Sequence, residues 1–122
     1  MIILIIFAVL IIAVVLEKTL FPLVNVIGTS MFPTYSDGEV IFSTRLFNKK
    51  NLKRGDVITY RVLELTGEDR IVIKRVEKID PVKGVYCLGD NAEVSNDSRY
   101  YGYVPFHCIV TKILFPRDKC VV

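Results

Sequence analysis

The chain of 122 residues is long enough for one domain and an anchoring segment, but not for a second domain of ordinary size. Its formal net charge of +3 at pH 7 is too small to predict a nucleic-acid partner. A lone histidine, His107, and three cysteines without metal-ligand spacing predict no metal centre and no other cofactor. One disulfide with one free thiol, or three free thiols, are equally compatible with Cys87, Cys108 and Cys120.

The N-terminus is a purely apolar run over residues 1–16, which as a helix rises about 24 Å against roughly 30 Å of bilayer hydrocarbon. It spans a membrane only if Glu17 and Lys18 extend toward the headgroups and part of 19–24 joins it. A cleaved signal peptide is the alternative, but no basic stretch precedes the run and no small-x-small site follows it. We predict a retained anchor over 1–21 and a separate domain over 22–122. Charge near the anchor does not decide its orientation.

Beyond the anchor, short runs rich in Val, Ile, Tyr and Phe alternate with turn residues, and this pattern predicts strands. Residues 66–69 and 81–84 have the composition of hairpin turns. No helical stripe longer than about two turns follows the anchor. The pattern predicts a compact all-β domain of antiparallel sheet. Its expected strands cover Val40–Thr44, Val57–Leu63, 71–79, 85–88 and 109–115.

Ser30 is the first chemically interesting residue, because Gly28 precedes it in a flexible approach and Pro33 fixes the turn that follows. A serine hydroxyl is a weak nucleophile and needs a base within hydrogen-bond reach. Taken alone, a serine at such a position is usually a plain turn residue.

Lys74 is the candidate base. In a strand it shares one face with Val72 and Val76, which predicts partial burial. Burial disfavours the ammonium form and lowers the pKa of a lysine, and a neutral amine is a competent general base. The alternative is a lysine whose stem lies along the sheet while its ammonium stays in water.

Residues 89–102 form a polar stretch dense in side chains that hydrogen-bond backbone, as a rigid irregular loop requires. Asp97 and Arg99 are placed to form an ion pair within it. The hydroxyl of Ser95 is a candidate for orienting the amine of Lys74, the role of the third member of a triad. An ordinary polar surface loop is the alternative.

Together these blocks resemble the type I signal peptidases, serine proteases that use a Ser/Lys dyad to trim secretory signal peptides. The similarity covers roughly residues 26 to 110, with a lysine as in the bacterial and mitochondrial inner-membrane form. The matching blocks, in the family's order, are Ser30-Met31-Phe32-Pro33-Thr34, Arg54-Gly55-Asp56-Val57, Lys74-Arg75-Val76, and Gly89-Asp90-Asn91 with Ser95, Asp97-Ser98-Arg99, Gly102 and Val104.

The resemblance implies a role for each of these residues. Ser30 would be the nucleophile and Lys74 the general base, with Ser95 hydrogen-bonded to the lysine and with Asp97 and Arg99 supporting the loop. The backbone N–H of Ser30 would bind the oxyanion. Gly28 stands where some members carry a second, hydroxyl donor, and Thr29 is a partial substitute. Apolar residues that would line shallow substrate pockets are Met31, Ile71 and Ile73.

The implied protein is a membrane-bound serine endopeptidase that cleaves N-terminal signal peptides from exported preproteins. Its catalytic domain, 22–122, would share the β fold of signal peptidases and self-cleaving repressors and would lie on the extracytoplasmic or intermembrane-space side. The partners implied are preprotein signal peptides and the lipid bilayer, without nucleic acid; the sequence predicts no oligomeric state. Two alternatives remain: a catalytically silent, membrane-tethered module that binds signal peptides, and a self-cleaving protease of the repressor type.

Overall fold

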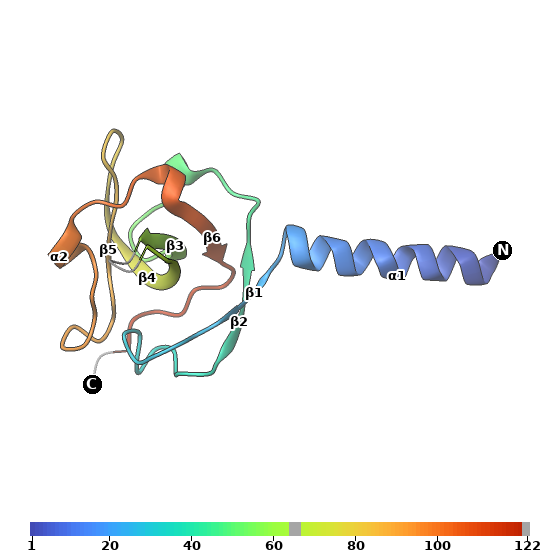
Figure 1. Cartoon of the computed structure of the whole chain (residues 1–122), viewed down its shortest axis with the longest axis horizontal. Coiled ribbons are helices and arrows are strands. Elements are labelled where there is room, and N and C mark those ends of the chain that lie inside the picture. The colour runs from blue at the N-terminus through green and yellow to red at the C-terminus, as the bar shows by residue number, and fades with distance from the viewer. Residues whose placement is uncertain (64–66, 121–122) are drawn as a thin grey trace.

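The computed structural model describes residues 1–63 and 67–120 (Figure 1). Its long helix, α1 (Ile2–Thr19), projects away from the rest of the chain, with the N-terminus at its far end (Figure 1). None of the side chains of α1 is buried, and its 18 residues rise about 27 Å. The helix is long and apolar enough to cross a membrane, and it ends inside the predicted anchor of 1–21.

The remainder is a six-stranded sheet in which every neighbouring pair of strands is antiparallel (Figure 1). The predicted fold class, an all-β domain behind a single N-terminal helix, is therefore confirmed. The order of the strands is β1-β2-β6-β3-β4-β5, so the last strand of the chain lies in the middle of the sheet. Their bounds are β1 (Leu23–Asn25), β2 (Val40–Thr44), β3 (Val57–Leu63), β4 (Asp69–Asp80), β5 (Gly84–Leu88) and β6 (Ile109–Ile113).

The observed strands differ from the expected ones at a few ends. β1 was not predicted, because three residues are too few for a side-chain alternation to be recognised. β6 ends before Phe115, whose φ of 52° lies in the left-handed region that a strand cannot use. Short helical turns complete the described chain: α2 (Ser98–Tyr101) and the 3₁₀ turns Lys49–Asn51 and Phe106–Cys108.

Both predicted hairpin turns connect strands that pair directly with each other. Asp80 pairs with Gly84 across the second turn, and the Asp80 carboxylate accepts hydrogen bonds from two backbone N–H groups within it. A Cβ on Gly84 would lie 2.0 Å from the carbonyl oxygen of Val104, so only glycine fits there. The first turn joins β3 to β4, which pair from Leu63 and Asp69 onward; Thr66 lies outside the described residues.

Two buried apolar clusters stabilise the domain, and β3 supplies both because its side chains alternate between faces. The first cluster lies around Ile58 and Tyr60 and consists of Leu52, Ile58, Tyr60, Val76, Val85, Cys87, Val104 and Ile109. The second lies under the turn that carries Ser30 and consists of Val26, Met31, Tyr35, Ile41, Val57, Ile73 and Ile113. Burying a side chain of this size contributes about 1.5–3 kcal/mol, so the second cluster fixes the Ser30 turn against the sheet.

The three cysteines within the described residues are free thiols, which decides between the alternatives left open for them. Cys87 is buried in the first cluster, Cys108 is half-buried and Cys120 is exposed. The lone histidine, His107, is exposed beside the start of β6.

Candidate active site

Ser30 and Lys74, which are far apart in the sequence, lie in contact. Ser30 stands on the turn that follows β1, and Lys74 lies in the middle of β4. The Nζ atom of Lys74 is 2.7 Å from the Oγ atom of Ser30, a full hydrogen bond. The sequence predicted both residues as a pair, and the fold brings them together.

The lysine is almost completely shielded from water, with 4% of its surface exposed. On its face of β4, Val76 is in the first apolar cluster and Val72 packs against it. Burial lowers the pKa of Lys74 from 10.5 to about 8. The nearby carboxylate of Asp97 opposes this shift, whereas the positive charge of Arg70 adds to it. A substantial fraction of the amine is therefore neutral near physiological pH, as a general base requires.

The turn that carries Ser30 is fastened through its backbone rather than through the reactive side chain. The N–H of Asn91 donates to the carbonyl of Ser30 at 2.8 Å, and the side-chain amide of Asn91 donates to the carbonyl of Thr29 at 3.0 Å. On the other side, the N–H of Gly28 donates to the carboxylate of Asp37 at 2.8 Å. Asn91 and Asp37 were missed as site residues, although Asn91 belongs to a block that the resemblance identified.

Ser95 does not make the predicted hydrogen bond to Lys74 within the described part of the chain. Its hydroxyl instead donates to Oδ2 of Asp97 at 2.6 Å. The serine packs directly on Gly89, where an added Cβ would come within 2.0 Å of Ser95 Oγ and 2.8 Å of the carbonyl oxygen of Ser30. Gly89 is thus the point where the polar loop and the Ser30 turn meet without room for a side chain.

Asp97 is the organising residue of the polar loop, and it is fully buried. Arg99 donates to it from Nε at 3.0 Å and from Nη2 at 2.6 Å, and the backbone N–H of Gly89 donates at 2.8 Å. Burial alone would raise the pKa of Asp97, but the hydrogen bonds from Arg99, Ser95 and the backbone outweigh it and hold this pKa well below its usual range. The predicted ion pair between Asp97 and Arg99 is present.

A second buried ion pair ties β4 to the same loop. Arg75 donates from both Nε and Nη2 to the carboxylate of Asp90, each at 2.9 Å, and from Nη1 to the carbonyl of Gly55 at 3.0 Å. Its partner Asp90 is nearly inaccessible, with 2% of the side chain exposed. The backbone N–H of Asp90 in turn contacts the sulfur of Met31 at 3.4 Å.

Two open clefts, of about 560 and 610 Å³, adjoin at the dyad, since Ser30 and Lys74 line both. Ile71 and Ile73 line the larger cleft, as expected of pocket residues. Met31 does not, because its side chain points into the second apolar cluster and is 1% exposed. The prediction that Met31 lines a substrate pocket is therefore corrected: it supports the turn from below.

The expected oxyanion site lies at the backbone N–H of Ser30, beside Gly28 and Thr29. The backbone N–H of Ser30 has no acceptor among residues 1–63 and 67–120, which leaves it available to a ligand. Gly28 and Thr29 line the smaller cleft beside Ser30.

In the described part of the chain, no three His, Cys, Asp or Glu side chains gather as a metal ion would require.

Comparison with known proteins identifies the family of the chain. The family model described as "Signal peptidase, peptidase S26" matches residues 1–80 and 80–117. The mitochondrial inner membrane protease subunit 1 of Mus musculus is 31% identical over 107 residues, and that of Homo sapiens is 28% identical over 106 residues. Each match covers 72% of this chain and 64% of the relative, so the chain spans less than two thirds of the relatives' length. With a family model matched along almost its whole length, the chain belongs to the signal peptidase family, peptidase S26.

Proposed function

We propose that this protein is a membrane-anchored serine endopeptidase that removes signal peptides from exported preproteins, with Ser30 as nucleophile and Lys74 as general base. The observation that carries the proposal is the 2.7 Å contact between Ser30 Oγ and the amine of a buried lysine whose pKa is lowered to about 8. A silent binding module has no chemical need for such a pair.

The reaction would proceed in two steps. Neutral Lys74 takes the proton of Ser30 as Oγ attacks the scissile carbonyl carbon, and the oxyanion accepts a hydrogen bond from the backbone N–H of Ser30. The C–N bond then breaks, and the lysine gives its proton to the new amino terminus of the mature protein. In the second step Lys74 takes a proton from water as the water oxygen attacks the ester; the C–Oγ bond then breaks, the lysine returns this proton to Ser30 Oγ, and the signal peptide leaves with a free carboxyl group.

The substrate would bind as an extended strand in the larger cleft. This cleft is lined by β1 residues 23–25 on one side and by β4 residues 69–74 on the other. Among the described residues, β5 pairs with β4 only from Arg75 onward and β1 pairs with β2 alone, so both strands offer an open edge there. A peptide strand placed between two open edges gains backbone hydrogen bonds along its length, while alternate side chains enter the pockets. Lining by Ile71 and Ile73 favours small apolar side chains near the cleaved bond.

The proposal is tested by incubating the detergent-solubilised full-length protein with a preprotein that carries a signal peptide. We expect the wild type to cleave after a small residue and Ser30→Ala and Lys74→Ala to be inactive. Cleavage that survives in Ser30→Ala would overturn the nucleophile assignment. No cleavage by any variant, together with retained binding of a signal peptide, would favour the silent module.

Location is part of the same proposal. We place the catalytic domain on the extracytoplasmic or intermembrane-space side of the membrane, where exported preproteins emerge. Protease added to sealed vesicles of known orientation would digest the domain only from that side. Digestion from the opposite side alone would reverse the orientation.

A further inference from the structure

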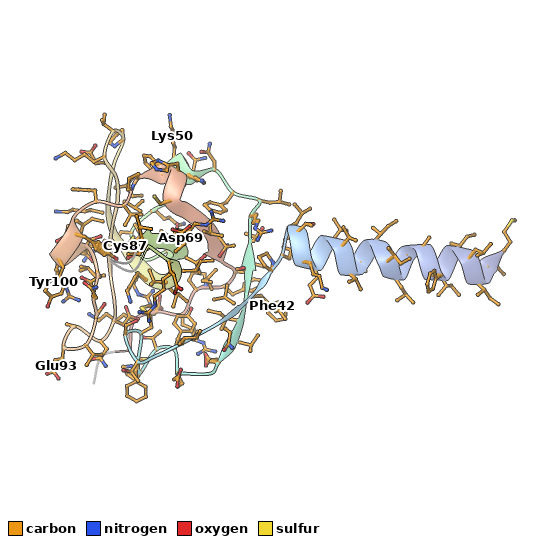
Figure 2. All side chains as sticks on the ribbon, viewed as in Figure 1. Phe42, Lys50, Asp69, Cys87, Glu93 and Tyr100 are labelled. Carbon is orange, nitrogen blue, oxygen red and sulfur yellow. The ribbon has the colours of Figure 1, made fainter. Side chains whose placement is uncertain are left out.

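The end of α1 is bonded to the sheet instead of leading into a free tether. Nη1 of Arg45 donates to the carbonyl of Thr19 at 2.8 Å and lies 3.5 Å from that of Lys18. The backbone N–H of Arg45 donates to the carbonyl of Leu20 at 2.8 Å, and that of Ser43 to the carbonyl of Pro22 at 3.2 Å. Figure 2 marks this corner of the molecule by Phe42, which stands beside the inner end of α1.

These hydrogen bonds stabilise the C-terminal end of α1, where helix carbonyls need partners. The last carbonyls of a helix have no partner within the helix, and a cationic donor there also interacts favourably with the helix dipole. A spanning α1 of about 27 Å would place Thr19 at the boundary between hydrocarbon and headgroups. Water is scarce at that depth, so carbonyl groups need protein donors more than they do on an ordinary surface.

From this corner to the nucleophile the chain is short and fixed. β1 follows directly and pairs with β2 through all three of its residues. Val26 comes next and is 1% exposed; its N–H donates to the carbonyl of Glu39 at 2.8 Å, and its carbonyl accepts from Gly38 at 2.7 Å. Ser30 then follows on the turn described above. These hydrogen bonds hold the chain from Leu20 to Val26, and the N–H of Gly28 is bonded to Asp37, so we expect the fold to set the distance from the helix end to Ser30.

The larger cleft runs between the same two points. Pro22, Leu23 and Arg45 line it near the helix, and Ser30 and Lys74 line it at the dyad. A substrate whose apolar segment spans the bilayer beside α1 would therefore enter near Arg45 and reach Ser30 after a fixed length of extended chain.

We propose that Arg45 is a positioning residue: by tying the end of α1 to β2 it fixes the height of the dyad above the bilayer and thereby selects which peptide bond of a membrane-inserted substrate meets Ser30. This inference rests on the proposed function. Loss of the Arg45 side chain removes the bond to the Thr19 carbonyl and loosens the end of α1, while the backbone bonds to Leu20 and Pro22 and the dyad itself stay in place.

The test uses the full-length protein in lipid nanodiscs and two substrates: a membrane-inserted preprotein, and a soluble peptide with the same cleavage site but no apolar segment. For Arg45→Ala we expect kcat/KM on the inserted preprotein to fall about fivefold or more, and its products to spread over neighbouring bonds in mass spectrometry. Because Arg45 also lines the larger cleft, we expect cleavage of the soluble peptide to fall as well, but less than cleavage of the inserted preprotein, and to keep a single product. Arg45→Lys keeps the charge and one donor group and restores part of the cleavage precision.

The matched control is Arg54→Ala, which removes an exposed arginine paired with Glu77 outside both clefts. We expect it to behave as wild type on both substrates. Equal losses on both substrates in Arg45→Ala, or unchanged rate and a single product on the inserted preprotein, would overturn the inference. Wild-type protein that cleaves neither substrate would count against the proposed function instead. In that case, hydrogen exchange of the backbone amides of Ser43 and Arg45 still tests the inference. Exchange is faster in Arg45→Ala if the Arg45 side chain holds the end of α1 to the sheet, and unchanged exchange overturns the inference.

Discussion

Asn91 and Ser30 are joined through their backbones, the N–H of Asn91 donating to the Ser30 carbonyl at 2.8 Å. The polar loop therefore holds the main chain of Ser30, the proposed nucleophile, while the Ser30 hydroxyl accepts a hydrogen bond from Lys74. Since the loop is itself fastened to β4 through Asp90 and Arg75, the turn, the loop and the lysine strand form one connected unit. Perturbing any contact in this unit is expected to change catalysis before it changes the fold.

Gly89→Ala tests the closest approach in this unit. The added methyl would lie 2.0 Å from Ser95 Oγ and 2.8 Å from the Ser30 carbonyl oxygen, so one of them must move. We expect kcat on a soluble peptide to fall about tenfold or more, because a displacement near 1 Å is costly in an aligned site. Gly38→Ala is the control: nothing lies within 4 Å of its added methyl, although its φ of 84° adds backbone strain. Similar losses of activity in the two variants would contradict the steric argument.

The pH dependence of activity follows from Lys74. The proposed mechanism needs the neutral amine, and with a pKa of about 8 roughly a tenth of the lysine is neutral at pH 7. We expect kcat/KM to rise with pH through about 8 and to fall about tenfold for each pH unit below it. Steady-state cleavage of a soluble peptide between pH 5 and pH 9 measures this. A profile that is flat down to pH 5 would rule out Lys74 as the base.

Lys74 is also expected to reduce the stability of the protein. Its pKa is about 8 when folded and 10.5 when exposed, so the unfolded state binds more protons between these values and stability rises with pH there. Below pH 8 the folded state bears the full cost of a buried charge, about 3 kcal/mol or less. Lys74→Met should therefore be inactive but more stable than wild type at pH 7, with the difference shrinking above pH 10. Circular dichroism of thermal unfolding at both pH values measures it; a variant less stable at pH 7 would contradict the expectation.

Asp97→Asn tests the loop in the acid range. The pKa of Asp97 is held below its ordinary value when folded, so its contribution to stability is present above about pH 4 and is lost as pH falls further. We expect the variant to be less stable at pH 7 by about 3 kcal/mol, because a buried hydrogen-bonded network loses its charge. The difference in stability between wild type and Asp97→Asn should shrink as the pH falls toward 2. Asp118→Asn, at an exposed carboxylate, serves as the control. A gap that is the same at pH 7 and pH 2 would show that ionisation is not involved.

Much of the site could be predicted from sequence because it depends on local regularities. The alternation of a strand placed Lys74 on a face with two valines, and that face is buried as expected. The turn residues bounded most strands correctly, since glycine, proline and aspartate act through their own backbone preferences. The order of the strands was beyond such rules, because β6 enters the sheet between strands from much earlier in the chain.

Other features depended on contacts that sequence neighbours do not reveal. Met31 directly follows Ser30, yet the turn sends the Met31 side chain into the core while Ser30 faces the cleft. The sequence assigned the Ser95 hydroxyl to Lys74, and only the tertiary arrangement shows that it bonds to Asp97. Arg117 belongs to no recognisable motif, although it donates to the Thr34 carbonyl at 3.0 Å beyond the Ser30 turn.

The central position of β6 has a consequence for the timing of assembly. β2 and β3 do not pair with each other; each pairs with β6, so the half that carries Ser30 and the half that carries Lys74 are joined across the sheet by β6. While the chain is being synthesised, the helix and the nucleophile emerge long before that strand does. The sheet that connects the Ser30 half to the Lys74 half is therefore continuous only after the chain has been made as far as Ile113.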